Sequence, residues 1–261
     1  MRTWIIILLT IGSGLLSMGM AQETIKISLV FLEHSETLSF DEKRLPDAQI
    51  LRGDVCFRHD SILMYCDSAY FFEKKNSLHA FGHVHLLQGD SIEGFGDRLY
   101  YNGNTKMAKF RKRVKLIHNK ETTLLTDSMN YDRAQNIAYY FSGGTIKDTI
   151  NTLTSNWGQY TPKNNQALFS NSVELVHPKF VLTCDTLCYN TKTYQADLVS
   201  PTKIVYEYET TILSSNGWYN TETEQSMLLN RSLIIHTDGM TLTGDTIYYD
   251  KAVGYGKVLG N

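Results

Sequence analysis

The chain has 261 residues, a formal charge of −2 and 42% hydrophobic residues, which excludes an intrinsically disordered or collagen-like protein. With 25 basic against 27 acidic residues, it lacks the basic excess of a general nucleic-acid binder, so we expect no nucleic-acid partner. Four cysteines are too few for a disulfide scaffold, and 16 tyrosines together with many Thr, Ile and Val residues favour an all-β fold.

The first 21 residues have the pattern of a signal peptide. Arg2 supplies a positive start, the run from Trp4 to Leu16 is almost wholly apolar, and Ala21 fits the small-residue rule before a cleavage point. The apolar run is shorter than the roughly 20 residues that span a bilayer, so an uncleaved anchor is the weaker alternative. We therefore expect cleavage after residue 21 and a soluble, exported domain over residues 22–261.

The remaining chain repeats one short phrase, an acidic residue followed two and four positions later by an apolar and an aromatic residue. The copies recur every 29 to 31 residues, which is typical of a protein built from stacked repeats. Eight units fill residues 22–261 and leave no room for a separate catalytic domain. Six copies are regular and two are degenerate: Glu36-Leu38-Phe40, Asp67-Ala69-Phe71, Asp97-Leu99-Tyr101, Asp127-Met129-Tyr131, Asp185-Leu187-Tyr189 and Asp245-Ile247-Tyr249, then Asn156-Gly158-Tyr160 and Ser215-Gly217-Tyr219.

Each unit has the pattern of an antiparallel hairpin that turns a corner. Turn formers such as Asn102-Gly103 follow the aromatic position. Counted from the acidic residue as position 0, positions 0, +2 and +4 lie on one face of a strand. An apolar residue at position −3 would lie on the opposite face of a straight strand. The residue at −3 and the residues at 0, +2 and +4 can all face inwards if the strand has a bulge between −3 and 0, beside a small residue such as Cys66. We therefore predict an elongated antiparallel sheet whose stacked units bury one apolar interior, with two walls meeting like an open V around a trough.

Three segments resemble the organic-solvent-tolerance (OstA) family: Ala48–Val55, Ala80–Val84 and Leu182–Tyr189. The resemblance spans residues 24–261 and is closest to the long, Bacteroidota-type members. It implies a V-shaped β-jellyroll that binds the acyl chains of lipopolysaccharide in its interior during outer-membrane assembly. It also implies a periplasmic or outer-membrane-associated protein that joins other LptA-type jellyrolls, or itself, by pairing edge strands. The chain stops within a unit, so we expect either a truncated C-terminus or an open edge there.

The resemblance assigns the lining of the trough to the repeated phrase and to the apolar pairs that end each second strand. These lipid-binding candidates are Leu38, Phe40, Leu99, Tyr101, Met129, Tyr131, Tyr160, Leu187, Tyr189, Tyr219, Ile247 and Tyr249, with Val84, Leu86, Val114, Leu116, Val173 and Leu175. The alternative is an exported structural or adhesive β-repeat protein, or a carbohydrate-acting β-helix. That alternative predicts an interior filled by side chains and no trough.

Seven of the 25 basic residues lie between positions 106 and 120. Lys109, Arg111, Arg113 and Lys115 are candidates for contacts to lipid A phosphates or to another anionic partner. The alternative is a solvated strand whose charges guard against aggregation, and the pattern favours that alternative.

No residue set indicates metal, cofactor or catalytic chemistry. The acidic positions are more typical of corner caps than of a Ca²⁺ site or a paired-carboxylate site, and no catalytic motif is present, so we expect no enzyme activity. Histidines at 59, 118, 177 and 236 recur every two repeats, too far apart for one metal, and His83 with His85 lacks a third ligand. Cys56 and Cys66 either form a disulfide across adjacent strands or, as we favour, remain buried thiols.

Overall fold

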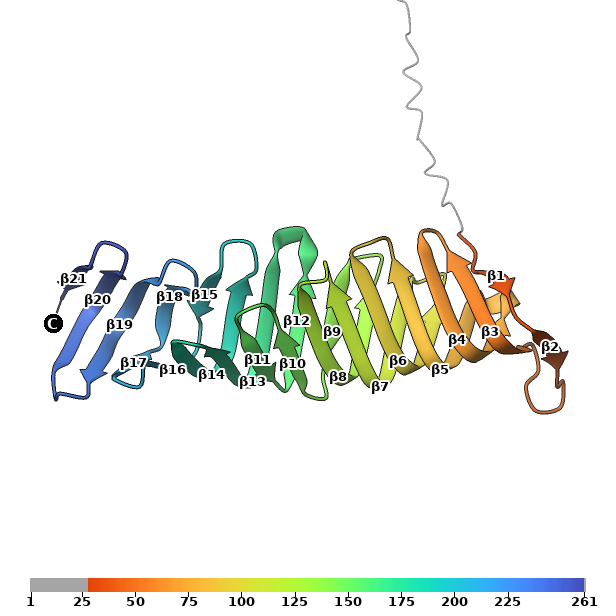
Figure 1. The fold of residues 1–261 in the computed structure, drawn as a ribbon, viewed down its shortest axis with the longest axis horizontal. Helices are drawn as coiled ribbons and strands as arrows, with labels where there is room; N and C mark the ends of the chain where they lie inside the picture. The colour runs from red at the N-terminus through yellow and green to blue at the C-terminus, as the bar shows by residue number, and fades with distance from the viewer. Residues whose placement is uncertain (1–27, 261) are drawn as a thin grey trace, which may run out of the picture.

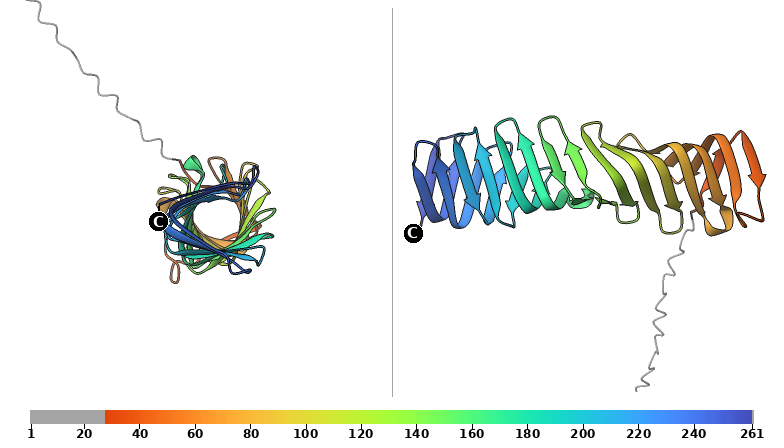
Figure 2. Two further views of the ribbon diagram at one scale, coloured as in Figure 1. Left: turned by 90° about the vertical axis from the view of Figure 1, so that its left-hand side faces the viewer. Right: turned by 90° about the horizontal axis from the view of Figure 1, so that it is seen from below.

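The structure is a computed structural model that describes residues 28–260, so the predicted signal peptide lies outside the described residues. These residues form one continuous antiparallel sheet, wound into an elongated β-jellyroll (Figure 1). The end-on view shows the strands surrounding one long axis (Figure 2). The predicted all-β fold class is therefore confirmed. Within the described residues, no helix has the length and apolar character needed to cross a membrane.

The long strands have 10 to 12 residues each and bend in the middle. They are β3 (Gln49–His59), β4 (Ile62–Phe72), β5 (Ser77–Gln88), β6 (Ile92–Asn102), β7 (Met107–His118), β8 (Thr122–Asp132), β13 (Gln166–His177), β14 (Phe180–Asn190), β19 (Gln225–His236) and β20 (Thr241–Asp250). Consecutive long strands form hairpins, for example β3 with β4 and β5 with β6. One hairpin corresponds to about one 30-residue unit of the sequence.

Elsewhere the bend interrupts the strand, so two short strands take the place of one long strand. The short strands are β1 (Phe31–His34), β2 (Thr37–Phe40), β9 (Ile137–Tyr140), β10 (Gly144–Lys147), β11 (Thr152–Ser155), β12 (Trp157–Thr161), β15 (Gln195–Leu198), β16 (Thr202–Tyr206), β17 (Thr210–Ser214), β18 (Asn216–Asn220) and β21 (Tyr255–Leu259). The interruptions at Asn156 and Ser215 fall on the two degenerate copies of the phrase. The strand is also interrupted at Glu36, between β1 and β2, where the phrase is regular, so loss of the acidic residue is not required for an interrupted bend.

The bend divides the sheet into two walls. The aromatic wall contains the +2 and +4 positions of the phrase, for example Ala69 and Phe71, and includes β2, β9, β12, β15, β18 and β21. The aliphatic wall contains the −3 positions, for example Met64 and Leu182, and includes β1, β10, β11, β16 and β17. Every long strand contributes one half to each wall.

The corner between the walls is built from a bulge of two left-handed residues. Gly53 and Asp54 of β3, with φ of 76° and 43°, stand opposite the single residue Asp67 of β4. The same arrangement recurs at residues 82–83, 112–113, 171–172 and 230–231. The predicted bulge therefore exists, but it lies on the strand next to the acidic residue and not between positions −3 and 0. The extra residue bends the strand and sends it from one wall to the other.

The prediction that the acidic residue shares the buried face with positions +2 and +4 is wrong. In β4, Met64 and Cys66 are buried before the corner, Ala69 and Phe71 are buried after it, and Asp67 between them is exposed. The buried face of β4 therefore changes between Cys66 at −1 and Ala69 at +2, because the corner turns the chain outwards at Asp67. The small residue at −1 lies inside the bend, as predicted.

The interior is a continuous apolar core. One cluster of buried side chains runs from Val30 to Tyr140 and a second from Leu153 to Ile247. Ile146 of β10 packs against both clusters and joins them. No single hairpin buries its own apolar face, so stacking of successive units supplies the stability of the fold.

Candidate functional site

Most of the predicted trough residues lie in this interior. Fully buried are Leu99, Tyr101, Met129, Tyr131, Leu187, Tyr219, Ile247, Val84, Leu86, Val114, Val173 and Leu175. Leu116, Tyr160 and Tyr189 are partly buried against the same clusters. The sequence pattern therefore identifies inward-facing residues along nearly the whole length of the jellyroll.

Three predicted residues lie near the ends of the jellyroll and are exposed. Leu38 and Phe40 of β2 lie at the N-terminal end, where 66% of Phe40 is exposed. Tyr249 of β20 lies at the other end, where Val258 and Leu259 of the neighbouring strand β21 are also exposed. Apolar side chains thus reach the surface at both ends of the sheet.

The two walls pack directly against each other, so the predicted residues line a closed interior and not an open trough. Phe57 of the aliphatic wall and Phe71 of the aromatic wall have ring centroids 5.3 Å apart. Phe180 and Tyr219 make a similar contact at 5.1 Å in the second cluster. In both places an aromatic ring of one wall packs against an aromatic ring of the other, as expected for a close-packed protein interior.

The edge opposite the corner is a seam between two rows of turns. The aromatic rim consists of the turns of the aromatic wall, such as 103–106 and 221–224, and the aliphatic rim of those of the other wall, such as 60–61 and 207–209. Tyrosines at the +4 position reach across this seam. Tyr131 donates a hydrogen bond to Gln88 at 3.2 Å, and the rings of His118 and Tyr160 have centroids 5.8 Å apart.

Near the N-terminal end, five residues form a charged cluster across the seam, the N-terminal clasp: His59, Asp60, Tyr101, Lys106 and Arg133. Lys106 donates to the Asp60 carboxylate at 3.0 Å, and an Arg133 nitrogen lies 3.7 Å from the same oxygen. Arg133 also donates to the Tyr101 hydroxyl at 2.6 Å, and that hydroxyl is 2.5 Å from Nδ1 of His59. A hydrogen bond from Ser28 and the bond from Lys106 hold the pKa of Asp60 at about 2.

His59 is fully buried within this cluster. Because the Tyr101 hydroxyl accepts from Arg133, its own proton points to Nδ1, which leaves the ring proton of neutral His59 on Nε2. Burial lowers the pKa of His59, and the neighbouring Arg133 adds to that effect. Within residues 28–260, neither His59 Nε2 nor Arg133 Nε has a hydrogen-bond partner.

A second cluster, the C-terminal clasp, contains Lys179, Tyr206, Glu207, Glu224 and Lys251. The Glu224 carboxylate accepts hydrogen bonds from Lys179 and from Tyr206, the latter at 3.0 Å, both across the seam. Lys251 lies 2.5 Å from Glu224 and also donates to the Tyr206 hydroxyl. Burial alone would raise the pKa of Glu224, but the hydrogen bonds from Lys179, Lys251 and Tyr206 lower it to about 2.

Comparison with known proteins identifies the family. A family described as OstA-like protein matches residues 27–185, which is more than half of the chain. The chain belongs to the OstA-like family. No curated protein matches it.

Among solved structures, this OstA-like protein is similar to LptH of Pseudomonas aeruginosa, described as the LptA-homologous periplasmic component of that organism's lipopolysaccharide transport device. The two chains are 16% identical, and the alignment covers 42% of this chain and 79% of the other, with a TM-score of 0.37. These values are too low to transfer a function.

The four predicted phosphate contacts of the OstA-like protein lie on β7, and two of them already have partners. Arg111 donates to the backbone oxygens of Phe110 and Met129, at 2.6 and 3.1 Å, and Arg113 pairs with Asp97 at 2.8 Å. Lys109 and Lys115 are exposed on the outer face of the sheet. The four residues do not converge on one point, so the solvated-strand alternative describes their positions better.

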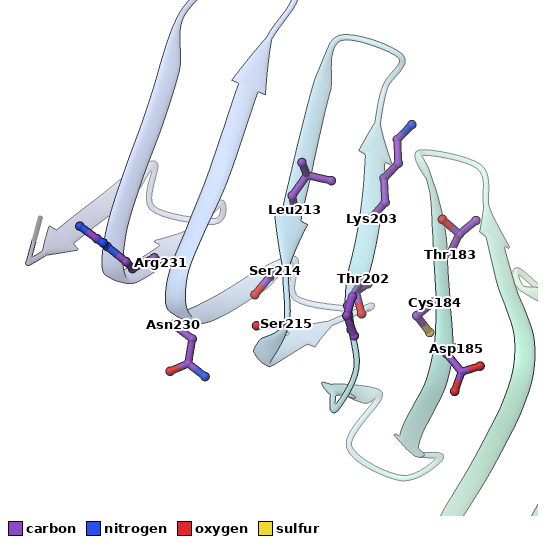
Figure 3. Close-up of a pocket in the computed structure, with 11 residues that line it drawn as sticks. Thr183, Cys184, Asp185, Thr202, Lys203, Leu213, Ser214, Ser215, Asn230 and Arg231 are labelled. Carbon is purple, nitrogen blue, oxygen red and sulfur yellow. The ribbon is translucent and has the colours of Figure 1, made fainter.

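Two surface hollows lie along the corner and not in the interior. The larger, of about 590 Å³, is bordered by β14, β16, β17 and β19, and its lining includes Asp185, Lys203 and Arg231 (Figure 3). The smaller, of about 440 Å³, includes Cys56, Cys66 and His83. Both occur where bulges or interrupted strands open the corner, and neither contains a predicted lipid-binding residue.

All four cysteines of the OstA-like protein are free thiols. Cys56 pairs in register with Tyr65, whereas Cys66 pairs with Val55, so the two cysteines belong to successive rows and point to opposite faces of the sheet. The disulfide alternative therefore fails on geometry. Burial raises the pKa of the Cys66 thiol to about 12 and that of Cys184 to about 11.

The acidic positions act at the corners. Asp67 contacts His83 at 2.8 Å, and Asp97 pairs with Arg113, in each case a left-handed residue of the next strand. A Cβ atom at Gly82 would lie 2.2 Å from the Asp67 carboxylate. Among residues 28–260, no group of three His, Cys, Asp or Glu side chains is arranged to hold a metal ion.

Proposed function

We propose that this OstA-like protein is a periplasmic lipid carrier that shields the acyl chains of lipopolysaccharide in its apolar interior during outer-membrane assembly. The observation that carries the proposal is the continuous apolar interior, which joins Val30 to Ile247 through Ile146. Membership in the OstA-like family supports the same conclusion.

Burial of acyl chains in this interior supplies the driving force. Removing apolar surface from water stabilises a complex by about 25 cal/mol per Å². The interior side chains are packed, so lipid must separate the walls and replace contacts between Leu, Val and Tyr side chains with contacts of the same apolar kind. The exposed apolar residues at both ends, such as Phe40 and Leu259, would continue the shielded path into a neighbouring jellyroll joined by edge strands.

Lipid carried through purification tests the proposal. The full-length protein is produced in a host that makes lipopolysaccharide, purified without detergent and analysed by native mass spectrometry. A carrier retains lipopolysaccharide or lipid A in a defined ratio, and adding lipopolysaccharide to stripped protein restores the same complex. Protein that never retains lipid and shows no saturable binding contradicts the proposal.

A packed interior also favours a second candidate, an exported structural or adhesive β-repeat protein. Twelve of the predicted trough residues are fully buried, as that function requires. Such a protein would neither retain lipid through purification nor bind added lipopolysaccharide. Its unfolding would also be unaffected by added lipopolysaccharide.

A further inference from the structure

The two long edges of the jellyroll are joined in different ways. At the corner, the long strands run without a break from one wall to the other. Across the seam, the contacts described above are made by side chains, and the strongest of them are the two charged clasps. The rims can therefore separate without loss of a backbone hydrogen bond of the sheet.

Each clasp gathers two basic side chains around a central carboxylate, and in the C-terminal clasp a second carboxylate, Glu207, lies 3.8 Å from Lys251. Asp60 of the aliphatic rim faces Lys106 and Arg133 of the aromatic rim. In the other clasp, Glu224 of the aromatic rim faces Lys179 of the aliphatic rim and Lys251 of its own rim. A carboxylate and a phosphate accept the same charge-assisted hydrogen bonds from lysine and arginine.

The N-terminal clasp also has donor capacity that its own residues do not use. Only 7% of the Arg133 side chain is exposed, and its Nε and the Nε2 of His59 are both buried without a hydrogen-bond partner in the described part of the chain. A buried guanidinium is costly unless its donors are satisfied. An anion with several oxygens would satisfy donors that the single Asp60 carboxylate leaves unused.

We propose that the seam is a lateral opening for a phosphorylated amphiphile, and that Lys106, Arg133, Lys179 and Lys251 bind its headgroup phosphates in place of Asp60 and Glu224. The inference rests on the proposed function and adds the side from which lipid enters and the groups that hold its headgroup. Acyl chains then lie between the walls while the polar headgroup stays at the water-facing seam, the orientation that an amphiphile requires.

Binding of two lipid probes tests the headgroup contacts. The probes are lipopolysaccharide with its phosphates intact and the same preparation after dephosphorylation, each titrated against the full chain. The double variant Lys106→Gln/Lys251→Gln should bind the intact probe about tenfold more weakly and the dephosphorylated probe unchanged. The matched control, Lys109→Gln/Lys115→Gln, loses the same charge from the outer face and should bind both probes like the wild type.

The outcomes separate the inference from the proposed function. If the clasp variant binds intact lipopolysaccharide as tightly as the wild type, the headgroup assignment is overturned while lipid binding stands. If inorganic phosphate alone binds the clasps and does not compete with the lipid, the cations serve a free-phosphate site and the inference also fails. If the wild type binds neither probe, the proposed function itself fails.

Spin labels on the rims test the opening without changing any clasp residue. Labels at Ser61 and Thr105 lie on opposite rims, and both positions are exposed. The distance between these labels should lengthen when lipopolysaccharide binds, whereas a control pair at Lys75 and Thr105, both on the aromatic rim, should keep its separation. An unchanged cross-seam distance in a sample with saturated lipid binding would overturn the lateral opening.

Discussion

Asp60 and Lys106 are separated by 46 positions in the sequence and lie on opposite rims of the seam, where a 3.0 Å ion pair joins them. The Gln88–Tyr131 contact spans 43 positions. Both offsets are close to one and a half repeats, and the seam also contains a shorter link, from Tyr206 to Glu224 over 18 positions. Opening the seam therefore affects several hairpins together.

Replacing Glu224 by glutamine should weaken closure of the seam. The change removes the carboxylate that both Lys179 and Lys251 contact and leaves Glu207, 3.8 Å from Lys251, as the remaining counter-charge. We expect the free energy of unfolding to fall by about 1–3 kcal/mol. Urea denaturation at pH 7 measures the loss. The contribution of Glu224 is present above pH 4.5, its ordinary pKa, and is lost as the pH falls towards 2.

Asp97→Asn is the matched control, because it also neutralises one carboxylate of an ion pair, but at the exposed corner with Arg113. Its effect should be clearly smaller. Equal losses for the two variants would contradict a special role for the seam.

The corner bulge predicts a strong position effect for glycine substitutions. Gly82 has φ of 72° and its missing Cβ would lie 2.2 Å from Asp67, whereas Gly89, with φ of 56°, has open space around it. Gly82→Ala should cost about 2–3 kcal/mol of stability, from backbone strain and displacement of the carboxylate. Gly89→Ala should cost about 1 kcal/mol, from backbone strain alone. Thermal and urea unfolding of the two variants would show whether Gly82 is the more sensitive site.

Acid should destabilise the seam before it affects most carboxylates. Burial lowers the pKa of His59, His118 and His177, all at the ends of aliphatic-wall strands. The unfolded chain therefore binds more protons below pH 6.5, and stability falls as the pH drops from 7.5 to 5.5. The free energy of unfolding should decrease across this range, and His118→Gln should flatten the slope. A stability that is constant or rises over this range would refute the assignment.

The thiols provide a covalent check on strand register. Because Cys56 and Cys66 point to opposite faces, the protein isolated from an oxidising compartment should contain four free thiols. Alkylation of the denatured, unreduced protein should add four labels, as counted by intact mass. Two labels would mean a disulfide and would require a different register between β3 and β4.

The recurring phrase and its fixed spacing predict much of this fold from the sequence. The phrase predicts the number of units, the inward-facing residues at +2 and +4, and the small residue inside each corner. The predicted position of the bulge is wrong. The alternation of side chains within one strand cannot show that the extra residue lies on the neighbouring strand. In β4 the side chain of Asp67 points outwards for that reason.

The sequence does not predict the seam, since most of its partners are more than 40 residues apart and no local pattern connects them. One signal was available in the sequence. Histidines recur at 59-residue intervals, and His59 and His118 both face tyrosines of the phrase across the seam. Similarly, residue type alone predicts an open trough, whereas in the structure Phe57 and Phe71 from the two walls pack against each other.

Photo-crosslinking from inside and outside the jellyroll tests lipid binding in the interior most directly. A photoreactive phenylalanine analogue replaces Tyr131 or Tyr189, which face the interior, or Tyr100, which pairs with His79 and Lys109 on the outer face. In cells that make lipopolysaccharide, irradiation should attach the lipid at Tyr131 and Tyr189 and not at Tyr100. Crosslinking from Tyr100 alone, or from none of the three positions while all variants are folded, would contradict an interior lipid path.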